Sequence, residues 1–403
     1  MHNVTYRQLQ PTELIRIIEN IFIFNLVILA CITILIYIVS SEVNFMSLME
    51  AMSASEVITN FKFPGMICEV KRAYDKYNKP TYKDDNGELI EGIYIDLENE
   101  VYHSLPAYSS SQIKTLVTKT PAHFYRQYLS GIDRKRTTKQ TQNTLDAGTY
   151  GHELILEPHG FYARYFRGIT ASDYPDALSL SVAGYREMCA DRGITIPKTA
   201  KKERCIEALK QAEPQLEFLD DLIAQHNNNT SHTGKKEIDP IVWDDAHRVL
   251  ESQEENEIAN ALVKNGLPEI SFITKCPITG MWLKCRFDWL RFDNIAVDVK
   301  TTRSTNPIEF AKQSGNLGYH IQEAFYTYVA SILGVKITNF IFLTVEYVEC
   351  DWCEVYELDD GEDAMQKMID GLNLLKHCKE TNSWRGYSHT DTIRKIKIPN
   401  YLL

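Results

Sequence analysis

The 403-residue sequence has no excess of basic residues and no disulfide-like spacing of cysteines. Its formal net charge of −11 argues against a protein that coats DNA nonspecifically, although a nucleic-acid enzyme needs only a local basic patch. Nine scattered cysteines, an odd count, suit a reducing compartment. Cys350 and Cys353 form the one tight pair, and a zinc site is not expected without a second pair. What is present is an ordinary globular composition, 44% hydrophobic and 24% charged.

One long uncharged run lies near the N-terminus, from Ile21 to Val39. It is long enough for a transmembrane helix, and the flanking charges would place the rest of the chain outside the cell. Three methionines follow within residues 46–52. We therefore expect residues 1–45 to be a removable leader or a misassigned start, with a membrane anchor as the alternative.

The remaining chain is expected to contain a lead-in segment over residues 46–105 and one domain over residues 106–403. A polar, helical stretch over about 172–264 indicates an insertion within that domain. Inside it, residues 193–209 join two amphipathic helices through an extended segment, which faintly resembles modules that touch the DNA backbone. An insertion packed on its own small core is the simpler interpretation.

The order of the other segments indicates the fold class. Strand patterns over residues 268–300 precede a helix that begins at about Pro307, and further strands are expected over 337–347 and 352–358. A helix over 362–378 closes the chain. This strand–helix–strand order predicts an α/β fold with a mixed central sheet flanked by helices.

The strongest chemical signal lies in two short apolar-rich runs around the tetrad Arg-Phe-Asp-Asn, which indicate a β-hairpin. If the turn centres near Asp293, Asp288 and Asp298 are equidistant from it and face each other across the ladder. Opposed residues have Cβ atoms about 5 Å apart, close enough for two carboxylates to hold one divalent cation. Alternation places Lys300 on the same face as Asp298. The alternative is an exposed hairpin that carries an Asp–Lys pair.

Further motifs occur in a fixed order along the chain. They are His152 in Gly-Thr-Tyr-Gly-His-Glu, Glu269, Asp288, Asp298-Val-Lys300, and Gln322-x-x-x-Tyr326. Together they resemble the RecB-like branch of the PD-(D/E)xK nucleases, and most nearly the nuclease domain of RecE, exonuclease VIII of phage recombination systems. The resemblance covers roughly residues 100–360 and is weakest between His152 and Glu269. It implies a restriction-endonuclease-like fold.

The resemblance assigns catalysis to Asp288, Asp298 and Lys300. Lys300 would orient and help deprotonate the attacking water, or stabilise the charge of the pentacovalent phosphate. Glu269 would position a second metal or a water. The alternative interpretation of Glu269 is a surface carboxylate at the end of a strand.

The resemblance also implies a metal site. Asp288 and Asp298 would hold Mg²⁺, with Mn²⁺ as a substitute, because these hard cations favour oxygen ligands. His152 would add an imidazole ligand or neighbour, and the backbone carbonyl of Val299 a further ligand. The alternative for His152 is a half-buried histidine that has found a hydrogen-bond partner.

Four residues are expected to contact DNA. Gln322 and Tyr326 share one helix face at i,i+4 spacing and match an element that touches DNA in this branch. Thr301 and Thr302 could donate hydroxyl groups to phosphate. The alternative for Gln322 and Tyr326 is a helix surface packed under a loop. The alternative for Thr301 and Thr302 is that their hydroxyl groups only hydrogen-bond the backbone at the end of the strand. A basic loop over residues 133–139 is a further candidate phosphate contact, although most charge runs are only solvated.

An iron–sulfur cluster is not expected. Members of this group that hold a cluster carry a cysteine before the proline where this chain has Thr120 and Pro121. The C-terminal cysteines, at positions 350, 353 and 378, are too widely spaced to complete a four-cysteine site.

The resemblance therefore implies a Mg²⁺-dependent DNA exonuclease of the bacterial cytoplasm. It would digest double-stranded ends in the 5′→3′ direction and leave 3′ overhangs for a RecT-like annealing partner. A ring-shaped tetramer is expected by the same resemblance. The alternatives are a non-cleaving recombination scaffold of the same fold and an endonuclease of the same family.

Overall fold

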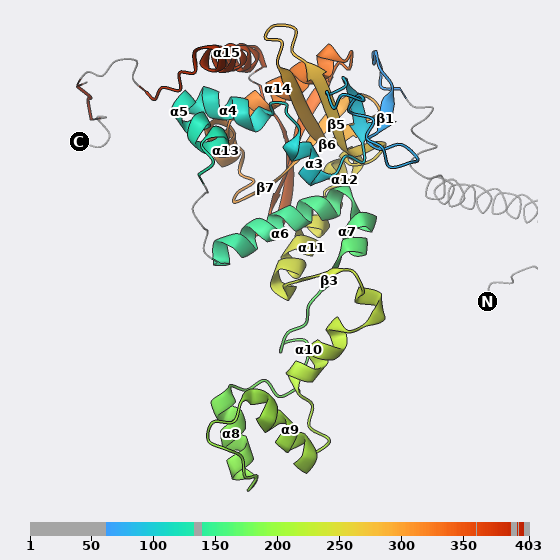
Figure 1. Ribbon diagram of the computed structural model, residues 1–403, viewed down its shortest axis with the longest axis vertical. Helices are drawn as coiled ribbons and strands as arrows, with labels where there is room; N and C mark the ends of the chain where they lie inside the picture. Colours follow the sequence, from blue (N-terminus) through green and yellow to red (C-terminus); the bar gives the residue numbers. More distant parts are fainter. Residues whose placement is uncertain (1–61, 133–138, 360, 388–392, 394, 399–403) are drawn as a thin grey trace, which may run out of the picture. The chain divides into compact units, whose positions relative to one another are not determined.

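A seven-stranded mixed β-sheet forms the centre of the fold (Figure 1). Its strands lie in the order β1-β2-β5-β6-β7-β8-β9, and within this sheet, over the described residues, the β1–β2 and β7–β8 pairs are parallel and the others antiparallel. The bounds are β1 Val70–Arg72, β2 Gly92–Ile95, β5 Gly266–Lys275, β6 Trp282–Arg291, β7 Ile295–Thr302, β8 Asn339–Glu346 and β9 Trp352–Glu357.

The computed structural model describes residues 62–132, 139–359, 361–387, 393 and 395–398. The apolar run from Ile21 to Val39 and most of the basic loop over 133–139 lie outside these residues. Across the described ranges, every helix is too short or too polar to cross a membrane.

Helices cover both faces of the sheet. On one face, α6 (Lys139–Leu156) and α11 (Pro240–Glu255) run side by side against β7 and β8 (Figure 1). On the other, α14 (Tyr319–Ile332) packs on β5 and β6, and α4 (Ser110–Thr118) and α15 (Gly361–Thr381) pack on α14. The predicted mixed sheet flanked by helices is confirmed.

Shorter helices connect these layers. They are α3 Asn99–Ser104, α5 Pro121–Phe124, the π-helix η1 Tyr125–Leu129, α7 Pro158–Arg164, α12 Glu257–Leu262 and α13 Pro307–Leu317. Pro158 begins α7 directly after α6 has ended at Leu156, because proline is favoured in the first turn of a helix.

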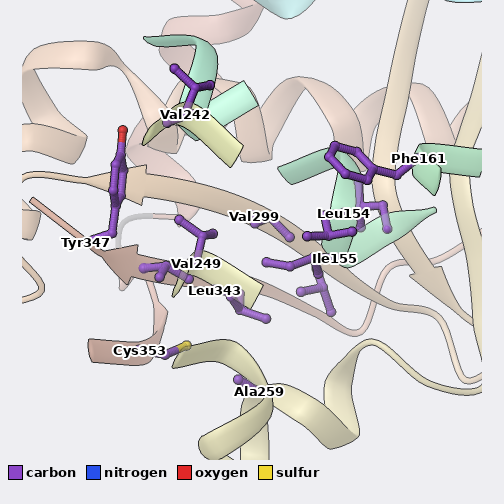
Figure 2. Close-up of a cluster of buried hydrophobic side chains, with 14 of the residues drawn as sticks. Leu154, Ile155, Phe161, Val242, Val249, Ala259, Val299, Leu343, Tyr347 and Cys353 are labelled. Atoms are coloured by element: carbon purple, nitrogen blue, oxygen red, sulfur yellow. The ribbon is translucent and has the colours of Figure 1, made fainter. Parts of the chain in front are cut away.

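The apolar layer between α6, α11 and the sheet fixes how β7 is oriented. Figure 2 shows Val299 of β7 and Leu343 of β8 packed with Leu154 of α6 and Val249 of α11. Burying a side chain of this size contributes roughly 1.5–3 kcal/mol, so the register of β7 is firmly set. Because side chains alternate along a strand, Asp298 is directed to the opposite face, toward α14.

The helix expected from Pro307 is in fact two helices. Gly318 adopts a left-handed conformation, with φ of 68°, and separates α13 from α14. Glycine reaches this conformation without a steric penalty and therefore commonly ends helices. The break gives α14 its own direction, and Gln322 lies one turn after it.

The expected insertion divides into two parts. Helices α8 (Val182–Asp191), α9 (Lys202–Ala212) and α10 (Leu219–Asn227) form a small unit whose core includes Tyr185, Cys189, Cys205, Leu209 and Phe218. A parallel strand pair that the sequence did not indicate, β3 (Tyr165–Arg167) and β4 (Lys236–Ile238), lies at its base. Helices α11 and α12 pack with the main core instead. In the expected lead-in segment, β1 and β2 extend the sheet through pairing of β2 with β5.

Candidate metal-binding and catalytic site

Three of the predicted site residues meet at one point of the sheet. His152 from α6, Glu269 from β5 and Asp288 from β6 each offer a ligand atom, and these atoms lie within 4.8 Å of one another. His152 Nε2 is 2.9 Å from Asp288 Oδ2. This trio is the one cluster of three or more histidine, cysteine or carboxylate side chains with such geometry among the described residues.

Glu269 reaches the cluster through an unusual backbone conformation. Its φ is 47°, although it lies inside strand β5 opposite Asp288. Backbone strain of this kind persists where the surroundings hold it, often at functional sites. Arg286 contributes to that hold: its Nη1 lies 3.5 Å from Glu269 Oε2, and its Nε donates to Ser271 Oγ. Burial, and then the Asp288 carboxylate, raise the pKa of Glu269 to about 7.

Asp288 lies where strands β6 and β7 separate. The ladder between them contains the pairs Trp289–Val297 and Leu290–Ala296 and goes no further. The side chain of Asp288 occupies the next position and accepts a hydrogen bond from Val299 N at 2.8 Å. The expected hairpin is present, and the Asp288 carboxylate reaches both the backbone of β7 and His152.

Asp298 forms a second group with Lys300 and Gln322. Lys300 Nζ forms an ion pair with Asp298 Oδ2, and Gln322 Nε2 donates to Asp298 Oδ1 at 2.6 Å. The Asp298 side chain is only 2% exposed. Burial raises its pKa, while the charge of Lys300 lowers it and that of Asp288 raises it. The two carboxylates are therefore coupled although they have different partners.

The charges of the site are mutually dependent. Burial lowers the pKa of His152, but the Asp288 carboxylate outweighs this and raises it to about 9. Burial raises the pKa of Asp288, but His152 and Lys300 bring it below its usual value. A protonated His152 thus neutralises Asp288, as a cation bound at the same point would.

The donor atoms suit a divalent cation. Glu269 and Asp288 supply hard oxygen ligands, and His152 supplies an imidazole, a set that Mg²⁺ or Mn²⁺ accepts. Asp298 Oδ2 is buried, and the Lys300 ammonium lies against it. Such a buried oxygen is stabilised by additional positive charge.

A cleft of about 1120 Å³ opens beside the site. Its wall is formed by α6, the end of β7 with the loop after it, α13 and the loop after β8. His152 and Lys300 belong to this wall, so the cleft reaches the candidate metal cluster at His152. Arg303 and Lys312 add positive charge along it.

The two threonines predicted to contact DNA both line the cleft. Thr301 is partly exposed there, and α6 approaches it closely at Gly148. Thr302 is buried, and its hydroxyl group can donate a hydrogen bond to the carbonyl of Ser304 or to Gln313 Oε1. Thr301 is thus the more accessible of the two.

The structure buries Gln322, leaves Tyr326 half-buried, and places neither in the wall of the cleft. Gln322 is buried and hydrogen-bonded to Asp298. Tyr326 packs edge-on against Phe287 and Phe340, and burial raises its pKa strongly.

Sequence reasoning missed three basic residues near the site. Arg303 and Lys312 are ordinary surface residues by sequence, and only the fold places them in one cleft. Lys114 donates to Gln322 Oε1 at 3.1 Å. A signal for Lys114 existed, because it lies between Ile113 and Leu116, both on the buried side of α4.

A protein-family model described as "PDDEXK-like domain of unknown function (DUF3799)" matches residues 109–395. Among solved structures, one named "Putative exonuclease" from Eubacterium rectale is similar over 76% of this chain and 97% of its own, with 11% identity and a TM-score of 0.41. Another, named SSO0001, is similar over 49% of this chain and 87% of its own, with 14% identity and a TM-score of 0.22. No curated protein matches. The family match includes every residue of the site described above.

Proposed function

The chain belongs to the family described as PDDEXK-like domain of unknown function (DUF3799), and on this premise we propose that it is a metal-dependent nuclease that hydrolyses DNA. The observation that carries the proposal is the cluster of His152, Glu269 and Asp288 beside the Asp298–Lys300 ion pair. A cleft with basic residues in its wall leads to both groups. Two carboxylates, a lysine and an open approach are what phosphodiester hydrolysis requires.

His152, Glu269 and Asp288 would hold the divalent cation, which we propose to be Mg²⁺, with Mn²⁺ as a substitute. When bound, the cation would polarise the phosphodiester and lower the pKa of a water molecule. The carbonyl of Val299 is a further candidate ligand, because its strand passes directly beside Asp288.

The protein's own groups would complete the reaction. Lys300, held beside Asp298 and 5.1 Å from the centre of the Tyr319 ring, would stabilise the negative charge that develops on the phosphoryl oxygens. Glu269, as a ligand of the cation, would also position the attacking water beside it. Thr301, Arg303 and Lys312 would contact the phosphates of the DNA strand in the cleft.

We further propose that the substrate is a double-stranded DNA end, digested 5′→3′ to leave a 3′ overhang. The support is the order of motifs from His152 to Tyr326. A RecT-like annealing protein would bind the overhang, and the enzyme would work as a ring-shaped homo-oligomer.

Digestion of end-labelled linear duplex and closed circular DNA tests the proposal. With Mg²⁺, we expect loss of linear DNA only, immediate release of a 5′ label, and no reaction in EDTA or with Asp298→Ala. Cutting of circular DNA would indicate an endonuclease, and early release of a 3′ label would reverse the polarity. DNA binding without cleavage in Mg²⁺ or Mn²⁺ would instead indicate a non-cleaving scaffold.

A further inference from the structure

Lys114 lies behind the candidate active site, at the end of a short chain of hydrogen bonds. Its Nζ donates to Gln322 Oε1 at 3.1 Å, and Gln322 Nε2 donates to Asp298 Oδ1 at 2.6 Å. We propose that Lys114 is a positioning residue, which fixes the side-chain amide of Gln322 so that its NH₂ group faces Asp298. The inference rests on the proposed nuclease function and concerns a residue outside the metal cluster and the cleft wall.

The direction of the chain follows from the donors and acceptors. A lysine ammonium can only donate, so the amide group next to Lys114 must present its oxygen. The NH₂ group is then turned toward Asp298, whose carboxylate accepts. Without Lys114, Asp298 alone would hold the amide of Gln322, and the buried amide oxygen would lose its donor. The side chain of Gln322 would then be fixed at one end only, and its NH₂ group would be positioned less firmly against Asp298.

The surroundings of Lys114 hold it in this place. A Cβ atom at Gly318, the break between α13 and α14, would lie 3.3 Å from Cγ and Cδ of Lys114, so the lysine stem fills the space beside that turn. The Lys114 ammonium is 5.7 Å from the centre of the Tyr319 ring, whose centre is also 5.1 Å from Lys300 Nζ. Two lysines therefore flank one aromatic ring beside Asp298.

A purely structural role does not account for a lysine here. Burial, and then the charge of Lys300, lower the pKa of Lys114 to about 8, so the fold disfavours this ammonium. An apolar residue of similar length would fill the same space without that cost. What an apolar residue would not supply is the donor to Gln322 and a positive charge near the buried Asp298.

The test compares Lys114→Met, Lys114→Arg and the control Lys119→Met, an exposed lysine at the end of the same helix. Rates on end-labelled linear duplex are measured against DNA and against Mg²⁺ concentration. For Lys114→Met we expect kcat about 10-fold lower, a higher Mg²⁺ requirement and a KM for DNA within about 2-fold of wild type. Lys114→Arg should keep most of the activity, and Lys119→Met all of it.

A double variant shows whether Lys114 acts through Gln322. If it does, adding Lys114→Met to Gln322→Ala costs nothing further, whereas an additive loss overturns the inference. A rise in KM for DNA with unchanged kcat also overturns it, since it would indicate a direct phosphate contact. If Lys114→Met does not fold, Lys114→Leu, which also lacks a donor, is interpreted by the same criteria.

The two proposals fail in different ways. Wild-type protein that cleaves no DNA in Mg²⁺ or Mn²⁺ rejects the nuclease function. An active wild type whose kcat and Mg²⁺ requirement are unchanged by Lys114→Met rejects only the role of Lys114.

Discussion

Glu269 occupies a backbone conformation that a glutamate disfavours, and this allows a test of strain against function. Its φ of 47° costs a residue other than glycine about 1 kcal/mol or more, while asparagine tolerates it better. We expect Glu269→Asn to abolish cleavage and to leave Tm in EDTA equal or higher, because a buried carboxylate next to Asp288 is also removed. Differential scanning fluorimetry and the linear-duplex assay measure both.

The control for this substitution is Glu217→Asn, on an exposed loop before α10. It should change neither Tm nor cleavage. A fall of several degrees in Glu269→Asn alone would mean that the contact with Arg286 stabilises the fold more than the strain and the carboxylate burial destabilise it.

His152 gives the metal-free protein a predictable dependence on pH. Its pKa is about 9 in the fold and 6.5 as the ordinary value, because Asp288 stabilises the protonated ring against burial. The ion pair with Asp288 therefore contributes its full stability below pH 6.5, and this contribution is lost as pH rises through 9. In EDTA, we expect Tm of the wild type to fall between pH 6.5 and pH 9.5 more steeply than that of His152→Asn. Parallel curves for the two proteins would contradict this.

At the scale of elements, the close approach of α6 to β7 places His152. A Cβ atom at Gly148 would lie 2.7 Å from Thr301 Oγ1 and 3.4 Å from Thr301 Cβ, so a larger residue must displace the Thr301 side chain or push α6 away from β7. We expect Gly148→Ala to lower kcat about 10-fold or more and to raise the Mg²⁺ requirement, since small displacements of a catalytic group are costly. Steady-state kinetics with Mg²⁺ titration measures both effects.

Gly315→Ala is the matched control. Gly315 lies within α13, and a Cβ atom there has open space around it. Alanine is the better helix former, so this variant should be as stable as the wild type or more so, with unchanged kinetics. Equal kinetic losses in both variants would show that helix propensity, not the contact with Thr301, is responsible.

The hairpin of β6 and β7 was predictable because its signals are local. Apolar-rich runs and a polar tetrad define the turn, and Asp288 and Asp298 follow from their equal distance to it. The point at which the pairing of β6 with β7 ends is not determined by local sequence. The two strands separate beyond Trp289, where His152 of the distant helix α6 meets Asp288. Sequence spacing predicted that the two carboxylates face each other, but not which distant side chain each of them contacts.

The break at Gly318 and the role of Lys114 were missed for a related reason. Residues on both sides of Gly318 favour a helix, so periodicity alone continues one helix through it. Lys114 lies 208 positions before Gln322, and only packing of α4 on α14 brings them together. His152 and Glu269 were identified through the order of motifs, not through any local pattern that specifies their contact.

At the scale of the whole molecule, the net charge of −11 must be reconciled with the proposed DNA substrate. The cleft gathers Lys300, Arg303 and Lys312, and Lys312 is paired with Glu309 at 2.9 Å. Each phosphate neutralised by such a residue releases counterions and adds about −0.9 to the slope of log affinity against log salt. Three contacts predict a slope of about −2.7, shallow for a DNA-binding protein.

Fluorescence anisotropy of duplex ends in Ca²⁺, at several salt concentrations, would measure this slope. We expect Lys312→Ala to reduce its magnitude by about 1, because one phosphate contact is lost. Lys198→Ala is the informative comparison, since Lys198 is exposed in the extended segment between α8 and α9. If only Lys312→Ala changes the slope, DNA is bound by the cleft alone. A change of the slope in Lys198→Ala would add the small helical unit to the DNA-binding surface. A slope steeper than about −5 in the wild type would require further phosphate contacts beyond the cleft.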